Sequence, residues 1–182
     1  MTTRPEPPPG ARRGPGPLRF RRAPSRALLA LLGLLVACGA GSSLEGSLSD
    51  ETSLAFDQVQ VQKSGSAIAV VYLKSLPAGG GNDTVLKVVA NTTGLDLTHA
   101  ISIDLAEAVG PAVRGSVTRA VSTDARRDFP PLVRGRLNLD AGATVGSKAS
   151  GSFTVAFGQG GSIGAGRTAF GDFSATVTEA GQ

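Results

Sequence analysis

Arginine is the residue type in this chain that is best placed to do chemistry. Six arginines fall between residues 114 and 136, and only Asp124 and Asp128 oppose them in that stretch. They are Arg114, Arg119, Arg126, Arg127, Arg134 and Arg136. In an alternating strand pattern, Arg114, Arg134 and Arg136 share the solvent face of neighbouring strands, where guanidinium groups suit phosphate or carboxylate ligands. The alternative is a charged, soluble face that discourages pairing at a sheet edge.

The sequence signatures of catalytic and metal sites are weaker than this arginine cluster. His99 is the sole histidine, whereas metal sites and Ser-His or Cys-His catalysis recruit histidine together with partner residues. The segment Gly161–Thr168 approaches a phosphate-binding loop, but Arg167 stands where lysine is required, and the following residues are strand-like. We therefore expect a hairpin loop there, a non-enzymatic protein and no cofactor or metal. A hydrolase that uses paired carboxylates is the least favoured alternative, because the acidic residues fall beside turns or on outward faces.

The only cysteine, Cys38, follows an apolar run from Ala27 to Ala37 that is preceded by Arg19, Arg21, Arg22 and Arg26. Eleven apolar residues are too few for a transmembrane helix, which needs about 20. An arginine-rich start, a short apolar core and small residues before the cysteine are typical of a secretory leader.

The tetrapeptide Leu35-Val36-Ala37-Cys38 resembles the lipobox of bacterial lipoproteins. The resemblance implies that Cys38 receives a diacylglyceryl group, that palmitate or a similar acyl chain follows, and that the leader is removed before Cys38. Membrane lipid is then the first partner, through acylated Cys38. In enterobacterial lipoproteins, an aspartate directly after the acylated cysteine favours retention in the inner membrane. This chain has Gly39 at that position, so the resemblance slightly favours the outer membrane, with the domain on the periplasmic or outer surface.

The positive charge of the whole chain belongs to the leader. Residues 1–37 hold seven arginines and one acid, Glu6, whereas the remainder holds eleven basic and thirteen acidic residues, a net charge of −2. Nucleic-acid binding therefore loses its main support. We divide the chain into a signal peptide (1–37) with a long, disordered Pro/Arg-rich start, a lipidated flexible tether (38–53) and a single β-domain (54–182). Within the tether, Leu44-Gly46-Leu48 leaves open the alternative of a first edge strand.

The residues after 53 show the patterns of short strands between turn signals. Residues 66–76 and 84–90 are apolar on both faces, which favours central strands. Residues 97–109 fit a strand by alternation and a helix by the stripe Leu97, Ile101, Leu105 and Ala108; we favour a strand followed by a short helical turn. Two near-repeats alternate, with Val113, Gly115 and Val117 inward in one, and Val133, Gly135, Leu137 and Leu139 inward in the other. A last hairpin pairs Phe153, Val155 and Phe157 with Phe173, Ala175 and Val177. The fold class is all-β, a sandwich of about nine short antiparallel strands, with a small β-barrel as the alternative.

These features predict a lipid-anchored cell-envelope protein whose non-catalytic β-domain is a structural or interaction module. The alternative is a module that binds an anionic ligand or lipid head group through Arg114, Arg134 and Arg136. An envelope protein or an anionic polymer is the expected partner of the domain. The sequence does not define the oligomeric state.

Overall fold

A computed structural model describes residues 41–181 of the chain. The chain divides into two units, Met1–Val36 and Ala37–Gln182, and the β-domain lies in the second. Its elements are η1 (Ser47–Asp50), β1 (Gln58–Ser64), β2 (Ala67–Ser75), η2 (Pro77–Gly79), β3 (Asn82–Asn91), β4 (Ile101–Asp104), β5 (Ala108–Val109), β6 (Ala112–Val113), β7 (Gly115–Ala120), β8 (Leu132–Leu139), β9 (Lys148–Phe157) and β10 (Thr168–Glu179). Residues 41–181 contain no α-helix, so the predicted all-β class is confirmed.

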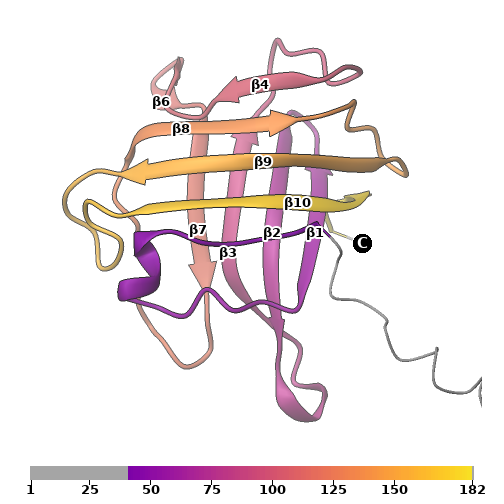
Figure 1. Cartoon of the computed structure of the whole chain (residues 1–182). Coiled ribbons are helices and arrows are strands. Elements are labelled where there is room, and N and C mark those ends of the chain that lie inside the picture. Colours follow the sequence, from indigo (N-terminus) through magenta and orange to yellow (C-terminus); the bar gives the residue numbers. More distant parts are fainter. Residues whose placement is uncertain (1–40, 182) are drawn as a thin grey trace, which may run out of the picture. The chain divides into compact units, whose positions relative to one another are not determined.

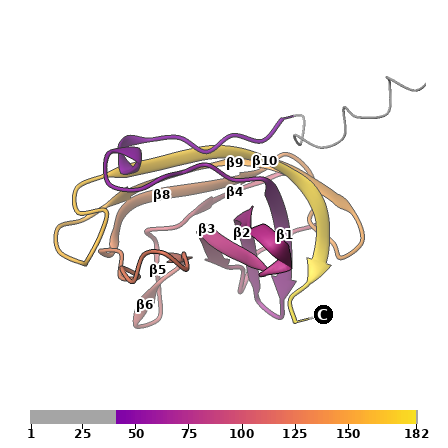
Figure 2. The same cartoon turned by 90° about the horizontal axis from the view of Figure 1, so that it is seen from below.

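Eight strands form one sheet in the order β4-β8-β9-β10-β1-β2-β3-β7, and β5 pairs with β6 in a small separate hairpin. All neighbours in the sheet are antiparallel except β1 and β10, which run parallel. Strands β8, β9 and β10 cross in front of β1, β2, β3 and β7 (Figure 1). Seen from below, the sheet curves round an interior (Figure 2). The sheet is thus nearly closed and barrel-like, in agreement with both of the architectures predicted.

Leu105 joins the two ends of the sheet. Its N–H donates to Gly135 O in β8 (2.9 Å), and its carbonyl accepts from Gly115 N in β7 (2.7 Å). One residue after β4 therefore bridges strands that lie far apart in the strand order. The helical turn expected after the first strand of 97–109 is wrong: β4 ends at Asp104, and a turn leads into the β5–β6 hairpin around Gly110 and Pro111.

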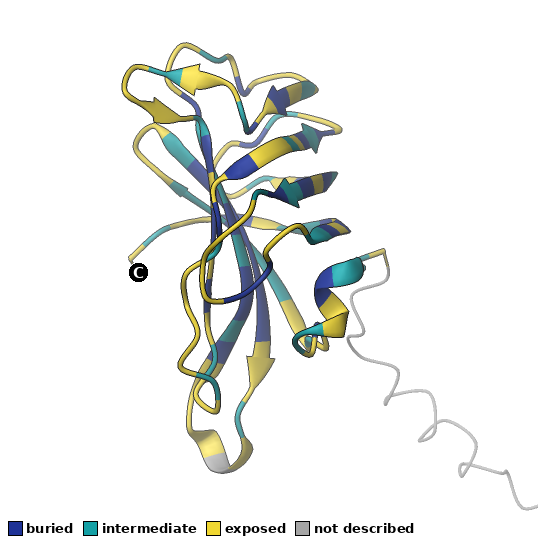
Figure 3. Ribbon diagram, turned by 90° about the vertical axis from the view of Figure 1, so that its left-hand side faces the viewer, coloured by how far each residue is buried: buried dark blue, intermediate teal, exposed yellow. Residues whose placement is uncertain are grey.

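The core fills the space between the two crossing layers. Tyr72, Phe153 and Phe173 are its largest fully buried side chains, and Phe56 packs edge-on against Tyr72 with ring centroids 4.9 Å apart. Strand residues alternate between buried and exposed along β9 and β10 (Figure 3). All residues of the main core cluster fall between Leu44 and Val177, so a chain that begins near residue 38 contains the whole core.

The flexible tether predicted over 38–53 is wrong where the structure describes it. We call residues 42–53 the strap, because they run along the edge of β10 (Figure 1). Ser43 and Asp172 exchange two backbone hydrogen bonds, of 3.0 and 3.2 Å, and Glu45 exchanges two with Phe170, of 2.8 and 2.9 Å. Leu44 and Leu48 of the strap are buried in the core. The domain therefore begins about ten residues earlier than predicted, because two leucines in a polar stretch supply the strap with an apolar side.

Gly46 explains how the strap lies so close to β10. Its φ of 129° is in the region that favours glycine, and a Cβ placed there would lie 2.3 Å from the carbonyl oxygen of Thr168. The strap then turns into η1, which places Leu48 in the core. Any other residue at position 46 would push the strap away from the sheet.

Two of the predicted inward valines point outward. Val113 is exposed because it belongs to the small β5–β6 hairpin and not to the sheet. Val133 is exposed because the pairing of β8 with β9 shifts between Leu132 and Arg134, so Leu132 takes the buried place instead. The inward assignments of Gly115, Val117, Leu137 and Leu139 agree with the structure, with Gly135 turned toward Leu105.

Candidate functional site

The arginines divide into two groups by their contacts. Residues 41–181 contain seven arginines, of which five are hydrogen-bonded within the domain. Arg134 and Arg136 are the exceptions: neither forms a hydrogen bond or an ion pair with another described residue. Both are exposed, and their guanidinium groups are free to meet a ligand.

Arg114 does not join them, which corrects the predicted three-arginine face. Its side chain is only 9% exposed, its Nε donates to Glu107 Oε2 (2.8 Å), and its Nη1 donates to Asn91 O (2.9 Å). Arg114 lies between β6 and β7, next to Gly115, which Leu105 links to Gly135 of β8. What separates Arg114 from Arg134 and Arg136 is therefore the engagement of its guanidinium by Glu107 and Asn91. The sequence alternation identified its neighbours along the chain, but it did not show which strands are adjacent.

Arg134 and Arg136 line one groove on the outer face of the sheet. They are two residues apart on β8, so their Cα atoms are separated by about 7 Å. Across the sheet, Arg134 is opposite Ala156, and Arg136 lies between Thr154 of β9 and Asp104 of β4. The groove has a volume of about 480 Å³ and is lined by Asp104, Ala106, Val133, Arg134, Gly135, Arg136, Thr154 and Ala156. Two free guanidinium forks beside a hydroxyl form a surface that suits a phosphate or carboxylate group.

A second hollow, which we call the end cleft, opens at one end of the curved sheet. It has a volume of about 440 Å³. Its walls come from the strap and the residues after it, the β2–β3 hairpin, and the end of β7: Thr52, Ser53, Ala55, Lys74, Ser75, Leu76, Pro77, Asp83, Val85, Arg119, Val121, Thr123 and Asp124. The structure thus brings together charged residues from the β2–β3 hairpin, Lys74 and Asp83, with Arg119 of β7 and Asp124 of the turn after it.

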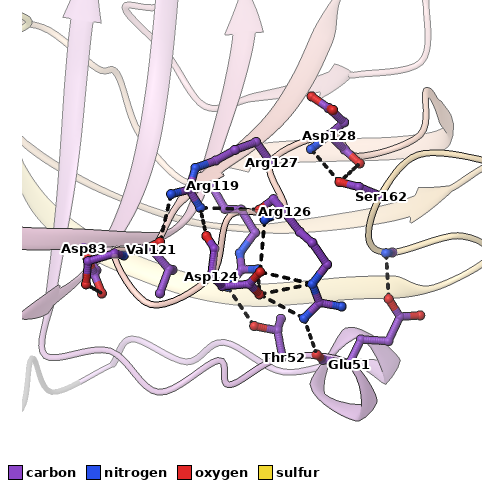
Figure 4. Close-up of polar contacts among 12 residues, drawn as sticks. Glu51, Thr52, Asp83, Arg119, Val121, Asp124, Arg126, Arg127, Asp128 and Ser162 are labelled. Carbon is purple, nitrogen blue, oxygen red and sulfur yellow. Dashed lines mark hydrogen bonds and ion pairs between the residues drawn. The ribbon is translucent and has the colours of Figure 1, made fainter.

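Arg119 is the central charged residue of the end cleft. Its side chain is only 2% exposed, its Nη1 donates to Asp124 Oδ2 (2.7 Å), and its Nη2 donates to Thr52 Oγ1 (2.8 Å). Arg126 approaches the same carboxylate from the other side (Figure 4), at 2.9 Å from Oδ2. Hydrogen bonds from Arg126 and Arg119 hold the pKa of Asp124 well below its usual value.

Asp83 is the second buried charged residue of this cleft. It is 8% exposed, and its carboxylate accepts hydrogen bonds from the N–H (2.8 Å) and the hydroxyl (3.2 Å) of Ser122. Our interpretation of the sequence missed both Arg119 and Asp83 as site residues. For Arg119 a signal existed, because the alternation Gly115, Val117 places the next odd residue inward. For Asp83 no such signal existed, because the pairing of β3 with β2 shifts between Thr84 and Leu86 and interrupts the alternation.

The glycine-rich segment 161–168 is, as expected, part of the loop between β9 and β10, except for Thr168, which begins β10. One backbone and one side-chain group of this segment bind a carboxylate of the protein itself: Gly164 N donates to Glu51 Oε2 (2.9 Å), and Arg167 Nε donates to Glu51 Oε1 (3.0 Å). The Gly164 N–H and the Arg167 guanidinium lower the pKa of Glu51. This loop therefore holds the strap and is not open to an incoming phosphate.

His99 lies on the surface, where its Nδ1 is 2.6 Å from the hydroxyl of Thr98. Within 41–181 no three histidine, cysteine, aspartate or glutamate side chains converge as metal ligands would. Phe170 and Val145 are exposed apolar residues, but neither lines the groove or the end cleft. The two arginine sites are therefore the places where ligand chemistry is concentrated.

Cys38 lies outside the described residues. Of the helices that the structure describes, none has the length and apolar character to cross a membrane. Comparisons with family models, curated proteins and solved structures gave no match to this chain.

Proposed function

We propose that this chain is an exported, lipid-anchored protein of the cell envelope whose β-domain is a non-catalytic interaction module. The lipobox-like tetrapeptide that ends at Cys38 supports the anchor, together with the short apolar run before it. Two or three acyl chains hold a protein firmly to a bilayer, because each buried methylene contributes about 0.8 kcal/mol.

One observation carries the binding part of the proposal. Arg134 and Arg136 are the arginines without a partner among the described residues, and they line the same groove. The other five arginines of residues 41–181 form hydrogen bonds within the domain. A pair of guanidinium groups kept out of such contacts is available for recognition.

The ligand chemistry that fits the groove is a phosphate or carboxylate group carried by a component of the envelope. Asp104 lies beside Arg136 and limits the positive charge, so the groove suits one or two anionic groups rather than a dense polyanion. The domain as a whole is acidic, which further favours a local contact over binding by net charge.

The anchor is tested by metabolic labelling with a radioactive fatty acid, with membranes then fractionated. The wild type should carry label in a membrane fraction, and Cys38→Ser should carry none. Label that persists in Cys38→Ser, or a wild type without label, would remove the lipoprotein proposal.

The groove is tested with the chain from residue 38 onward, with Cys38→Ser to avoid acylation. We expect its retention on vesicles that contain phosphatidylglycerol, on polyphosphate or on polyglutamate to fall with rising salt and to weaken in Arg134→Ala/Arg136→Ala. The three supports distinguish lipid phosphate, free phosphate chains and carboxylate. Lys63→Ala/Lys148→Ala removes the same charge elsewhere and is the matched control. Equal losses in the two double variants, or no retention on any support, would contradict a specific groove.

A further inference from the structure

The end cleft carries a second inference, which is independent of the groove. Its volume of about 440 Å³ lies within the range of roughly 300–1,000 Å³ of small-molecule sites. Ala55, Leu76, Pro77, Val85 and Val121 give it a largely apolar wall. Such a hollow accepts an apolar body of moderate size.

The buried arginine in this wall lacks one partner. Arg119 Nε is buried and has no hydrogen-bond acceptor among residues 41–181, although Nη1 and Nη2 are both bonded. A buried N–H without an acceptor is uncommon in folded proteins, and it costs free energy until an acceptor is supplied. Arg119 lines the cleft, so a molecule that enters the cleft is an external source of that acceptor.

The charges of the cleft indicate what kind of molecule fits. Four charged side chains line it, two of each sign. Arg119 is paired with Asp124, and Lys74 is directly opposite Asp83 in the register of β2 and β3. Because these charges balance, the cleft offers no net attraction to an ion, while burial of a charged ligand would cost desolvation.

We propose that the end cleft binds a small, uncharged and largely apolar molecule that carries a carbonyl-type acceptor, and that this acceptor is bound by the guanidinium of Arg119. The apolar wall takes the body of the molecule. The strap forms one side of the site through Thr52 and Ser53, so the residues that close the cleft are also those that precede β1.

The probe for this proposal is Prodan, an uncharged naphthalene with a ketone and a fluorescence that responds to polarity. Its 6-propyl analogue, in which a methylene replaces the carbonyl, is the matched probe without an acceptor. The protein is the chain from residue 38 with Cys38→Ser, which contains the whole core. We expect saturable binding of Prodan, and Ala55→Trp should weaken it at least about tenfold by filling the cleft. Ala141→Trp, at an exposed alanine outside the cleft, is the control.

Arg119→Lys separates the acceptor from the apolar wall, because lysine keeps the charge but has no Nε–H of this geometry. In the folded variant, Prodan should bind about fivefold more weakly, the equivalent of one hydrogen bond, while the propyl analogue binds unchanged. Absent binding, or binding unaffected by Ala55→Trp, would overturn the site. Equal effects of Arg119→Lys on both probes would overturn the role of Arg119. If Arg119→Lys does not fold, equal affinity of the wild type for the two probes overturns that role instead.

Discussion

Gly115 and Gly135 both pack against the side chain of Leu105, from the first residue of β7 and from the middle of β8. A Cβ on Gly115 would lie 2.5 Å from Leu105 Cβ, and one on Gly135 would lie 2.8 Å from the same atom. The two Val-Arg-Gly triplets of the sequence thus share a physical role: each ends in a glycine that leaves room for the residue that closes the sheet.

Gly115→Ala should therefore destabilise the domain. The added methyl group has no space beside Leu105, and overpacking of this kind costs typically 1–3 kcal/mol, so we expect about 2 kcal/mol in the free energy of unfolding from urea denaturation. Gly80→Ala is the control, because position 80 has φ −69° and its nearest atoms to a new Cβ are 3.5 Å away. Equal stability of the two variants would contradict the closure role.

The same contact predicts coupling. Leu105→Ala alone should cost about 2–5 kcal/mol, because it empties a fully buried position. In the double variant with Gly115→Ala, the clash with Leu105 Cδ2 (2.9 Å) is removed while the one with Leu105 Cβ remains, so the total loss should be somewhat smaller than the sum of the single losses. Additive losses would show that Leu105 Cδ2 takes no part in the overpacking.

The Arg119–Asp124 contact predicts sensitivity to acid. Hydrogen bonds from Arg126 and Arg119 lower the pKa of Asp124 in the folded state, so its contribution to stability is present above the usual pKa of 3.8 and is lost as the pH falls below it. Asp124→Asn should lower the urea midpoint at neutral pH, and the difference from the wild type should shrink toward pH 2. Asp128→Asn is the control, because the Asp128 carboxylate forms no hydrogen bond within the described residues. A constant difference at all pH values would contradict this assignment.

The contact between Glu51 and the β9–β10 loop predicts a local effect. Glu51→Gln removes the carboxylate that accepts from Gly164 N and Arg167 Nε, so the Gly164 amide should exchange with solvent at least about tenfold faster in hydrogen-exchange NMR. Asp50→Asn, which loses only a bond to Arg167 Nη1, should leave the Gly164 amide nearly as protected as in the wild type. Unchanged protection in Glu51→Gln would show that the loop does not depend on the strap.

Tyr72 provides a spectroscopic test at high pH, because it is the only tyrosine and the chain has no tryptophan. Burial raises its pKa in the folded state well above the usual 10, so stability is present below pH 10 and is lost as the pH rises further, when the unfolded chain loses the proton first. Tyrosinate absorbance at 295 nm should appear together with the loss of the β-sheet circular dichroism.

Tyr72→Phe is the control for that titration. It removes the hydrogen bond from the hydroxyl to Asp172 O (2.9 Å), which should cost about 1 kcal/mol at neutral pH. Above pH 10 its stability should change less with pH than that of the wild type. Tyrosinate absorbance that appears while the sheet remains folded would contradict a buried phenol.

Alternation along single strands was enough to predict the all-β class, the last hairpin and the inward faces around Val117 and Leu137, because the side-chain period of a strand is fixed. The strand order was beyond this reasoning. Arg114 and Arg134 have similar local sequences, yet they belong to regions at opposite ends of the sheet, and only long-range pairing determines that. Val133 was misassigned for a related reason, since a shift in pairing with β9 reverses the face locally.

The candidate site shows the same limit. Arg134 and Arg136 could be predicted as exposed, since both lie on the outward phase of one strand. Their lack of partners among residues 41–181 could not be predicted, because Glu107, Asp124 and Glu51 reach most of the other arginines there through turns and through the strap. The end cleft is assembled from segments far apart in the sequence, so no local pattern predicts it. The strap was assigned to a linker because its composition is that of a linker. The alternative of an edge strand around Leu44-Gly46-Leu48 was nearer to the structure, because the two leucines bind the strap to the core.

The pairing of Ser43 with Asp172 limits how far the domain can travel. With Cys38 acylated as proposed, only residues 39–42 separate the anchor from the sheet, a fully extended reach of about 17 Å. That distance is shorter than the domain is wide for a chain of this length. The domain would then sample only the layer next to the bilayer. Its local concentration would be high for a partner within that layer, and a partner beyond the layer would be out of reach. Lengthening the segment between residues 38 and 42 would widen that layer without any change in the binding surfaces.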